Sequence, residues 1–391
     1  MGNKLTPEIR FPGFTGDWEQ RQLGEISVKV TEKNKDNIYS ETLTNSAEFG
    51  IITQRDFFEK DISNKKNIDG YYIVHPDYFV YNPRISNFAP VGPIKRNKLG
   101  RTGIMSPLYY VFRTHDVDKT YLEYYFSGNG WHRFMNLNGD SGARSDRFAI
   151  KDSVFSEMPI PIPSIEEQVE VGNLFTELDD TISIRQQELD TLKQTKQGFL
   201  QKMFPKKGET IPEIRFPGFT GTWEECKVED IALVSTGNRD TQDALEDGKY
   251  DFYVRSPKIE KINSYSYDGE AVLTVGDGVG VGKVFHYVTG KFDYHQRVYK
   301  VSDFKDFNGL FFYYYFSDNF IYESRKYNAK TSVDSVRREM ITKMNIPNPN
   351  IEEQTQIGMF FKQIDDTITL HRQELETLKQ TKKAFLQKMF V

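Results

Sequence analysis

A stretch of 40 residues occurs twice in this chain, at 165–204 and again at 351–390. Twenty-five of the 40 aligned positions are identical. In both copies apolar side chains recur at steps of three and four residues, a spacing that places them on one face of an α-helix. The repeat therefore predicts two long helices, over residues 166–203 and 352–389.

Both copies also carry a signal that starts a helix. Ser164 lies three residues before Glu167, and Asn350 lies three residues before Glu353, which is the spacing of a capping box. A helix of about 38 residues would extend roughly 57 Å, which is too long to be stable without a partner for its apolar stripe. Because both copies keep the same stripe and length, we expect the two helices to pack on each other.

Polar residues interrupt the two stripes at matching places. They are Arg185 and Lys196 in the first copy and His371 and Lys382 in the second. Polar positions in a helix seam fix register and orientation at some cost in stability. We expect these residues to align the helix pair.

Composition limits the kinds of protein that fit. A chain of 391 residues predicts two or more domains, and 38% hydrophobic residues are enough for packed cores. The single cysteine, Cys226, excludes a disulfide framework and a cysteine-based zinc site, which fits a reducing cytoplasm. No apolar run approaches membrane-spanning length, so we expect no contact with a membrane.

A second phrase, PEIRFPGFTG followed by Asp or Thr and then WE, occurs at 7–19 and 212–224 with 12 of 13 positions identical. Between each box and the following helix lies a module that is not repeated in sequence. Both modules contain short apolar runs between Gly, Pro, Asn and Asp, typical of strands and turns, and then become more helical. The expected parts are an N-terminal box (1–19), a first module (20–157), a long helix (158–204), a linker with the second box (205–224), a second module (225–344) and a C-terminal helix (345–391).

The charges are segregated along the chain. The net charge of −5 argues against a nucleic-acid binder, yet no Asp or Glu occurs from Tyr78 to His115, while the helix at 166–204 has eight acidic and four basic residues. A basic patch is thus masked by an acidic scaffold. Two different modules on a repeated frame are typical of a pseudo-twofold protein that reads two half-sites on duplex DNA.

The box RFPGFTGDWE leading into QLGEI, the turn IPIPSIEEQ and the ending LKQTKQGFLQKMF, all duplicated, resemble the specificity subunits of type I restriction-modification systems. The resemblance covers nearly the whole chain. It implies an α+β fold in which two mixed α/β target-recognition domains are joined by two long antiparallel helices. It also implies that each domain reads one half of a split site on double-stranded DNA. The chain would recruit two modification subunits, which bind S-adenosylmethionine and methylate adenine, together with restriction (motor-nuclease) subunits. This chain would bind no cofactor itself.

Candidate DNA contacts are the basic residues of the two modules. Four lie within 92–103, which is expected to be a mobile basic loop able to neutralise phosphates, although an ordinary solvated loop fits equally well. Others follow in strand-like sequence of the second module or precede the proline-containing end of each module. The candidates are Arg84, Lys95, Arg96, Lys98, Arg101, Arg144, Arg147, Lys283, Arg297, Lys330, Arg337 and Arg338.

Motifs for catalysis are incomplete in this sequence. The pattern (N/D)-P-P-(Y/F) that an adenine methyltransferase needs fails at Asn82-Pro83-Arg84, and GDGVGVGK at 276–283 fails the phosphate-loop pattern, so a glycine-bearing strand or turn is preferred there. The histidines lack metal-ligand spacing, and no catalytic or metal site is expected. Asp179-Asp180 and its repeat Asp365-Asp366 are expected at exposed helical positions, where a solvated face or a partner contact is favoured over catalysis. The alternative function is a coiled-coil scaffold that docks two proteins and never binds DNA.

Overall fold

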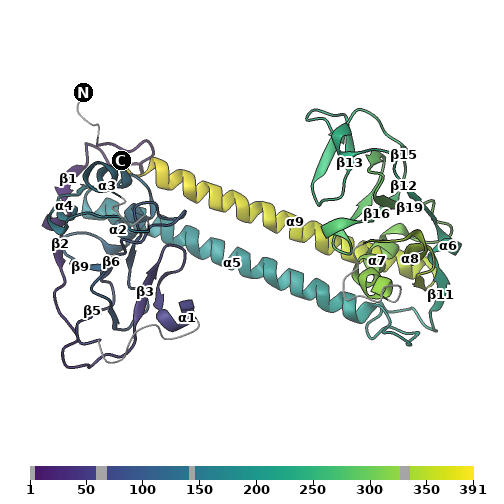
Figure 1. The fold of residues 1–391 in the computed structure, drawn as a ribbon, viewed down its shortest axis with the longest axis horizontal. Coiled ribbons are helices and arrows are strands. Elements are labelled where there is room, and N and C mark those ends of the chain that lie inside the picture. Colours follow the sequence, from purple (N-terminus) through teal and green to yellow (C-terminus); the bar gives the residue numbers. More distant parts are fainter. Residues whose placement is uncertain (1–4, 59–67, 141–145, 326–334) are drawn as a thin grey trace. The chain divides into compact units, whose positions relative to one another are not determined.

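The computed structural model describes residues 5–58, 68–140, 146–325 and 335–391 (Figure 1). The chain divides into two compact units, one formed by Met1–Arg185 with Glu374–Val391 and the other by Gln186–Gln373. Helix α5 spans Ile165–Met203 and helix α9 spans Ile351–Lys388. Both predicted long helices are therefore confirmed to within one residue at each end, and each contributes to both units.

The first module is built on a four-stranded antiparallel sheet in the order β2-β9-β6-β7. Its strands are β2 (Ser27–Lys29), β6 (Phe79–Tyr81), β7 (Ile94–Arg96) and β9 (Tyr110–Thr114). The module also has two two-stranded antiparallel sheets, the hairpin of β3 (Leu43–Ser46) with β4 (Gly50–Thr53) and the pair of β5 (Tyr72–Val74) with β8 (Gly103–Met105). The module's helices are α1 (Gln54–Phe58), α2 (Lys119–Ser127), α3 (His132–Asn138) and α4 (Asp152–Ser156).

The second module repeats this topology with different sequence. Its antiparallel sheet has the order β12-β19-β16-β17, with β12 at Leu233–Thr236, β16 at Ala271–Val275, β17 at Phe285–Val288 and β19 at Val298–Ser302. A further sheet contains β13 (Tyr250–Tyr253), β14 (Ile259–Ile262), β15 (Tyr267–Asp268) and β18 (Lys291–Tyr294). The helices are α6 (Val228–Ile231), α7 (Gly309–Ser324) and α8 (Arg338–Thr342). The predicted mixed α/β modules are confirmed.

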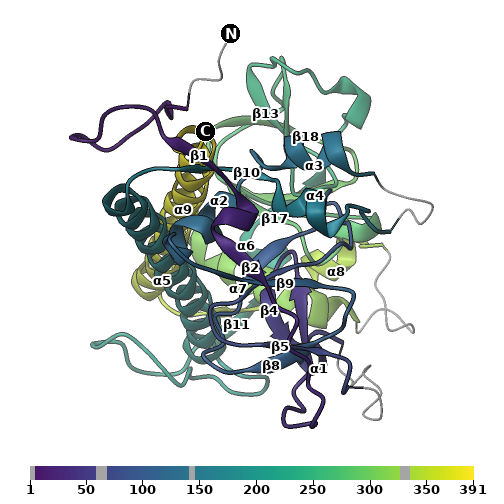
Figure 2. The same ribbon diagram turned by 90° about the vertical axis from the view of Figure 1, so that its left-hand side faces the viewer.

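Each module is closed by a two-stranded clamp (Figure 2). Strand β1 (Glu19–Gln22) pairs antiparallel with β10 (Pro159–Ile162), and β11 (Glu224–Lys227) pairs likewise with β20 (Asn345–Asn348). The first strand of each clamp follows a box, and the second runs into a long helix. The clamp therefore places the repeated box beside the start of the repeated helix.

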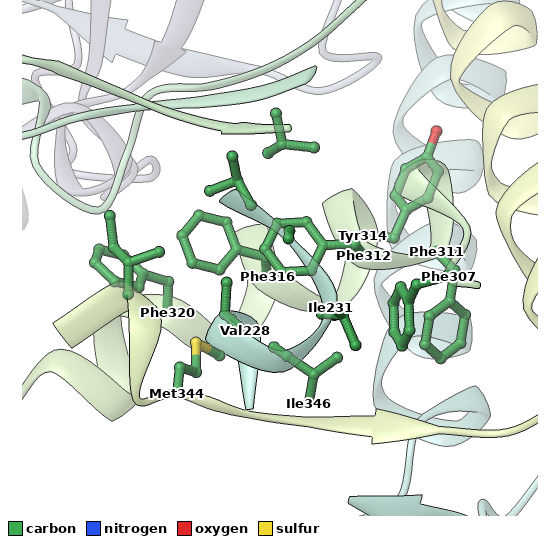
Figure 3. Close-up of a cluster of buried hydrophobic side chains, with 14 of the residues drawn as sticks. Val228, Ile231, Phe307, Phe311, Phe312, Tyr314, Phe316, Phe320, Met344 and Ile346 are labelled. Atoms are coloured by element: carbon green, nitrogen blue, oxygen red, sulfur yellow. The ribbon is translucent and has the colours of Figure 1, made fainter. Parts of the chain in front are cut away.

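The core of the second module gathers on α7, whose sequence is apolar on most sides. Figure 3 shows the rings of Phe312, Phe316 and Phe320 among aliphatic side chains such as Val228 and Met344. All three rings are fully buried, and burial of each aromatic side chain stabilises the fold by about 2–3 kcal/mol. The module thus forms a rigid support for the loops at its edge.

A buried ion pair joins the first box to helix α5. The guanidinium of Arg10 donates two hydrogen bonds of 2.7 Å to the carboxylate of Glu167, and the Trp18 indole donates to the same carboxylate at 3.3 Å. Arg10 also donates to the Gly16 carbonyl, which fixes the turn within the box. Hydrogen bonding to Glu167 raises the pKa of Arg10. A charge with 1% side-chain exposure is tolerated here because all these donors satisfy it.

The second unit contains the same network. Arg215 donates to Glu353 at 2.5 and 2.7 Å, and Trp223 donates to it at 3.1 Å. Of the two hydrogen bonds that define a capping box, only one is formed at the start of α9. Asn350 accepts the Glu353 amide, as expected, but the glutamate side chain binds the arginine of the box instead of the helix start.

Within each unit the two long helices run antiparallel and are joined by a lysine and an aspartate. In the first unit Lys382 of α9 pairs with Asp179 of α5, which also accepts a hydrogen bond of 2.9 Å from a tyrosine of α2. In the second unit Lys196 of α5 pairs with Asp365 of α9 at 2.6 Å. Two of the four predicted seam positions, Lys196 and Lys382, therefore form ion pairs with the other helix. The expectation of exposed positions was wrong for one aspartate of each repeated pair. Asp179 and Asp365 are each partly buried against the other helix.

Candidate nucleic-acid interface

The predicted basic loop at 92–103 is partly a strand. Residues Ile94–Arg96 form β7 beside β6, and only the residues that follow turn towards β8. Arg96 is 13% exposed and donates to Glu123 of α2 at 2.8 Å, while Lys98 lies 3.2 Å from the same carboxylate. An acid from a distant part of the chain thus neutralises a stretch that contains none of its own.

The remaining members of this predicted group point to different partners. Arg101 forms a two-pronged ion pair with Glu41 at 2.8 and 2.9 Å. Lys95 is half-buried, and burial lowers the pKa of its amine. Of the four residues, Lys98 and Arg101 are the exposed ones. The structure therefore does not bring these four side chains together as one cationic surface.

Two other predicted residues of the first module do meet. Arg84 follows β6, and Arg147 precedes α4, and the two form an antiparallel bridge. The amide of Phe148 donates to the Pro83 carbonyl at 2.7 Å and holds the two segments together. Arg84 is exposed, and Arg147 is partly exposed, with a buried Nε that lies 3.9 Å from the Asp146 carboxylate and makes no hydrogen bond among the described residues.

In the second module, Arg297 lies beside an arginine that sequence reasoning missed. Asp277 accepts from Arg255 at 3.4 Å and lies 3.6 Å from Arg297. Both arginines are more than half exposed. Arg255 follows β13 and Arg297 precedes β19, so only the fold brings them to one carboxylate. Lys283 is exposed after the glycine-rich turn.

The last predicted candidates lie before or within α8. Arg337 and Arg338 are exposed at the start of this helix, next to the Asp277–Ser335 bridge. The segments that contain Arg297 and Arg337 therefore both lie next to the loop that contains Asp277. Arg144 and Lys330 lie outside the described residues.

The glycine-rich string GDGVGVGK forms a turn, as preferred from its sequence, with a short 3-10 helix at Gly278–Gly280. The basic residue Lys300 does not lie on the exposed surface of the second module. Its side chain lies 3.3 Å above the Tyr267 ring, and burial lowers the pKa of its amine. Burial likewise lowers the pKa of His286 and of His295.

The described part of the chain contains no group of three His, Cys, Asp or Glu side chains placed to hold a metal ion. In the same residues, no helix combines the length and apolar character needed to cross a bilayer.

Comparison with protein families gives one match that covers most of the chain. The family described as "Type I restriction modification DNA specificity domain" matches residues 15–194 and 220–380. Each matched segment contains one module and most of one long helix. Among curated proteins, the MjaVIII specificity subunit of a type I restriction enzyme from Methanocaldococcus jannaschii is 22% identical over 61% of this chain and 62% of that protein. The EcoDI specificity subunit from Escherichia coli is 27% identical over 42% of this chain and 36% of that protein. The alignments thus span less than two thirds of either relative.

Solved structures share the fold over the full length. The S subunit of a type I restriction-modification system from M. genitalium superposes with a TM-score of 0.64 at 13% identity, and the match covers 99% of each chain. A chain from work on complex assembly and conformational transition of the type I R-M system gives a TM-score of 0.55 at 14% identity, covering 98% of each.

Proposed function

This chain belongs to the type I restriction-modification DNA specificity family, and on that premise we propose that it is the DNA-recognition subunit of a type I restriction-modification complex. Each module would read one half of a bipartite site on double-stranded DNA. The observation that carries this proposal is the pairing of an identical frame with unlike modules. The same Arg–Glu–Trp network holds both modules, whereas the residues at their loop tips differ.

The same duplication supports the recruitment of partners. Two identical modification subunits need two identical surfaces, and the frame supplies repeated exposed residues in both boxes, such as Pro12 with Pro217 and Ile9 with Ile214. We propose that these boxes and the outer faces of the long helices dock two methyltransferase subunits. S-adenosylmethionine would be bound by those subunits, and restriction subunits would join for cleavage. The assembly would act in host defence in the cytoplasm.

This chain would contribute no catalysis of its own. The proposal rests on the lack of a complete methyltransferase or nucleotide-binding motif in the sequence. A scaffold that binds proteins only is the competing function, and the ion pairing of Arg96, Lys98 and Arg101 favours it. The exposed arginines of both modules, Arg84 in the first and Arg255 and Arg297 in the second, favour DNA instead.

Mapping of adenine methylation tests the proposal directly. The chain is expressed with its two modification subunits, and residues 20–157 are exchanged for the corresponding module of a relative. One half of the methylated site should change, while the other half and the spacer persist. Methylation that needs the subunits but ignores the exchange would support the protein scaffold, and methylation by this chain alone would overturn the assignment.

A further inference from the structure

The two modules present one equivalent loop each, although their sequences differ. In the first module the loop joins β6 to β7, and in the second it joins β16 to β17, the corresponding strands of the two main sheets. Each loop is tied to the segment before the last short helix by the same backbone bond. Phe148 donates to the Pro83 carbonyl, and Val336 donates to the Gly276 carbonyl, both at 2.7 Å. We call these segments, 82–93 and 276–284, the tip loops.

Each tip loop is anchored firmly at its base. Gly92 has a φ of +82°, and a Cβ there would lie 2.1 Å from the Asn82 carbonyl oxygen, so only glycine fits. Asn45 donates to the carbonyls of Val80 and Pro93 at 2.7 and 3.1 Å. In the second module a Cβ at Gly280 would lie 2.7 Å from the Arg255 carbonyl oxygen. Close backbone packing at Gly92 and Gly280 thus restrains both tip loops.

Each loop nevertheless exposes one apolar side chain at its tip. Phe88 is 77% exposed and Val279 is 92% exposed. Each lies on the wall of a hollow, of about 560 Å³ in the first module and about 340 Å³ in the second. An apolar side chain that stays hydrated contributes no hydrophobic stabilisation to the fold. Its position suits contact with a partner.

Arginines flank both tips. Arg84 and Ser86 share the hollow of Phe88, and Arg255 and Asp277 share that of Val279. Guanidinium groups neutralise phosphates or bind guanine, and apolar side chains contact thymine methyls or the faces of opened base steps. Asn45, whose buried amide oxygen has no hydrogen-bond partner among the described residues, also lines the first hollow. An apolar side chain beside a guanidinium group is suited to contact the edge of a base pair and its neighbouring phosphates.

We infer that the two tip loops are the base-reading elements, with Phe88 and Val279 each making the apolar contact to one base pair of a half-site. This inference rests on the proposed DNA-recognition function and assigns residues to it. The apolar tip supplies discrimination at one position, and the flanking arginines supply orientation on the backbone. Because the tips differ in size, the two modules read different base pairs through one architecture.

The test uses the whole chain assembled with its modification subunits. Phe88→Ala and Val279→Ala are compared with Ile38→Ala and Leu233→Ala, which remove exposed apolar side chains elsewhere on the same modules. Methylation maps are recorded for each complex, and the thermal midpoint confirms folding. Phe88→Ala should relax one position of the first module's half-site by about tenfold, and Val279→Ala should do the same in the other half. The two control variants should keep the wild-type site.

The outcomes separate the inference from the function on which it rests. A wild-type complex that methylates a bipartite site, while Phe88→Ala and Val279→Ala leave that site unchanged, overturns the inference and leaves the proposed function intact. Equal relaxation in the control variants also overturns it, since the tips would then not be special. If the wild-type complex shows no site preference, the proposed function itself fails.

Discussion

Two buried carboxylates, Glu167 and Glu353, each accept hydrogen bonds from an arginine and a tryptophan of a repeated box. Neither is among the predicted site residues, and the cost of burying each carboxylate is offset by the hydrogen bonds that these partners donate. The duplicated residues were visible in sequence, but their contact was not, because Arg10 and Glu167 are separated by 157 residues.

Glu353→Gln tests this network. The substitution leaves Arg215, which is 14% exposed, without its charged partner, and breaking a buried pair is expected to cost about 3 kcal/mol of unfolding free energy. Denaturant-induced unfolding measures the loss. Glu352→Gln alters the exposed neighbour on the same helical turn and should change the free energy by less than about 0.5 kcal/mol. Equal effects in both variants would show that the pair has no special role.

The basic residues between β7 and β8 show why charge along the sequence misleads. The stretch from Tyr78 to His115 contains no acid, which suggested a free cationic patch. In the fold, Glu123 and Glu41 supply the missing acids. Long-range pairing of this kind leaves no periodic signal, so sequence reasoning could not exclude it.

The Lys98→Ala, Arg101→Ala double variant measures how much of this patch reaches DNA. If both side chains neutralise phosphates, the log–log slope of DNA affinity against salt concentration should flatten by about 1.8, at about 0.9 per contact. The methylated sequence should stay the same, since phosphate contacts carry no base information. An unchanged slope would mean that Glu123 and Glu41 are the final partners of these residues. Binding of the assembled complex across a salt series provides the measurement.

At the scale of elements, the long helices were predicted almost to the residue because their apolar period and caps are local signals. The strand and helix segments of the modules followed from short apolar runs, as with Ala271–Val275. The equivalence of the two modules was not predictable. It depends on strand order and on the bonds that tie the tip loops, whereas the two sequences share little.

A charge exchange across the helix seam tests what aligns the pair. Asp179→Lys places like charges opposite each other at Lys382 and should destabilise the first unit by about 1–3 kcal/mol. Adding Lys382→Asp should restore most of this loss, because the opposite charges then face each other again. Asp180→Lys, at the exposed neighbouring position, serves as the control. The thermal midpoints of the wild type, of the single variants Asp179→Lys and Lys382→Asp and of the double variant give the coupling, and an additive double variant would contradict the role of the seam in register.

At the scale of the whole molecule, each repeated box contacts the end of a long helix. Ile9 donates to the Lys388 carbonyl at 3.0 Å, as Ile214 donates to that of Lys202 at 2.9 Å. Phe175 stacks on Phe390, as Phe361 stacks on Phe204. The second unit has residues 205–211 between the helix end and its box, and the first unit has no such link. Leu5 and Val391 nevertheless line one cavity.

A circular permutant follows from this arrangement. Residues 205–211 are grafted between Phe390 and Pro7, and the chain is opened between Lys207 and Gly208 of the original linker. The graft supplies Thr210, whose carbonyl accepts from the Trp223 amide as that of Leu5 accepts from the Trp18 amide, so the thermal midpoint should stay within a few degrees and the methylated site should be unchanged. A permutant of the same composition opened inside α5, between Gln186 and Gln187, interrupts the seam and should fail to fold. Loss of site recognition in the first permutant alone would show that the units are not interchangeable in order.

Because α9 contributes to both units, the two units are completed at different times during translation. Residues 374–391 leave the ribosome after all of 186–373, so the second unit has its full set of residues while the first still lacks the last turns of α9. At typical elongation rates, the roughly 200 residues from 186 to 391 take on the order of 10–40 s to synthesise. Throughout that interval Phe390 is not yet available to stack on Phe175. The unit whose residues begin to be made first is therefore the one completed last.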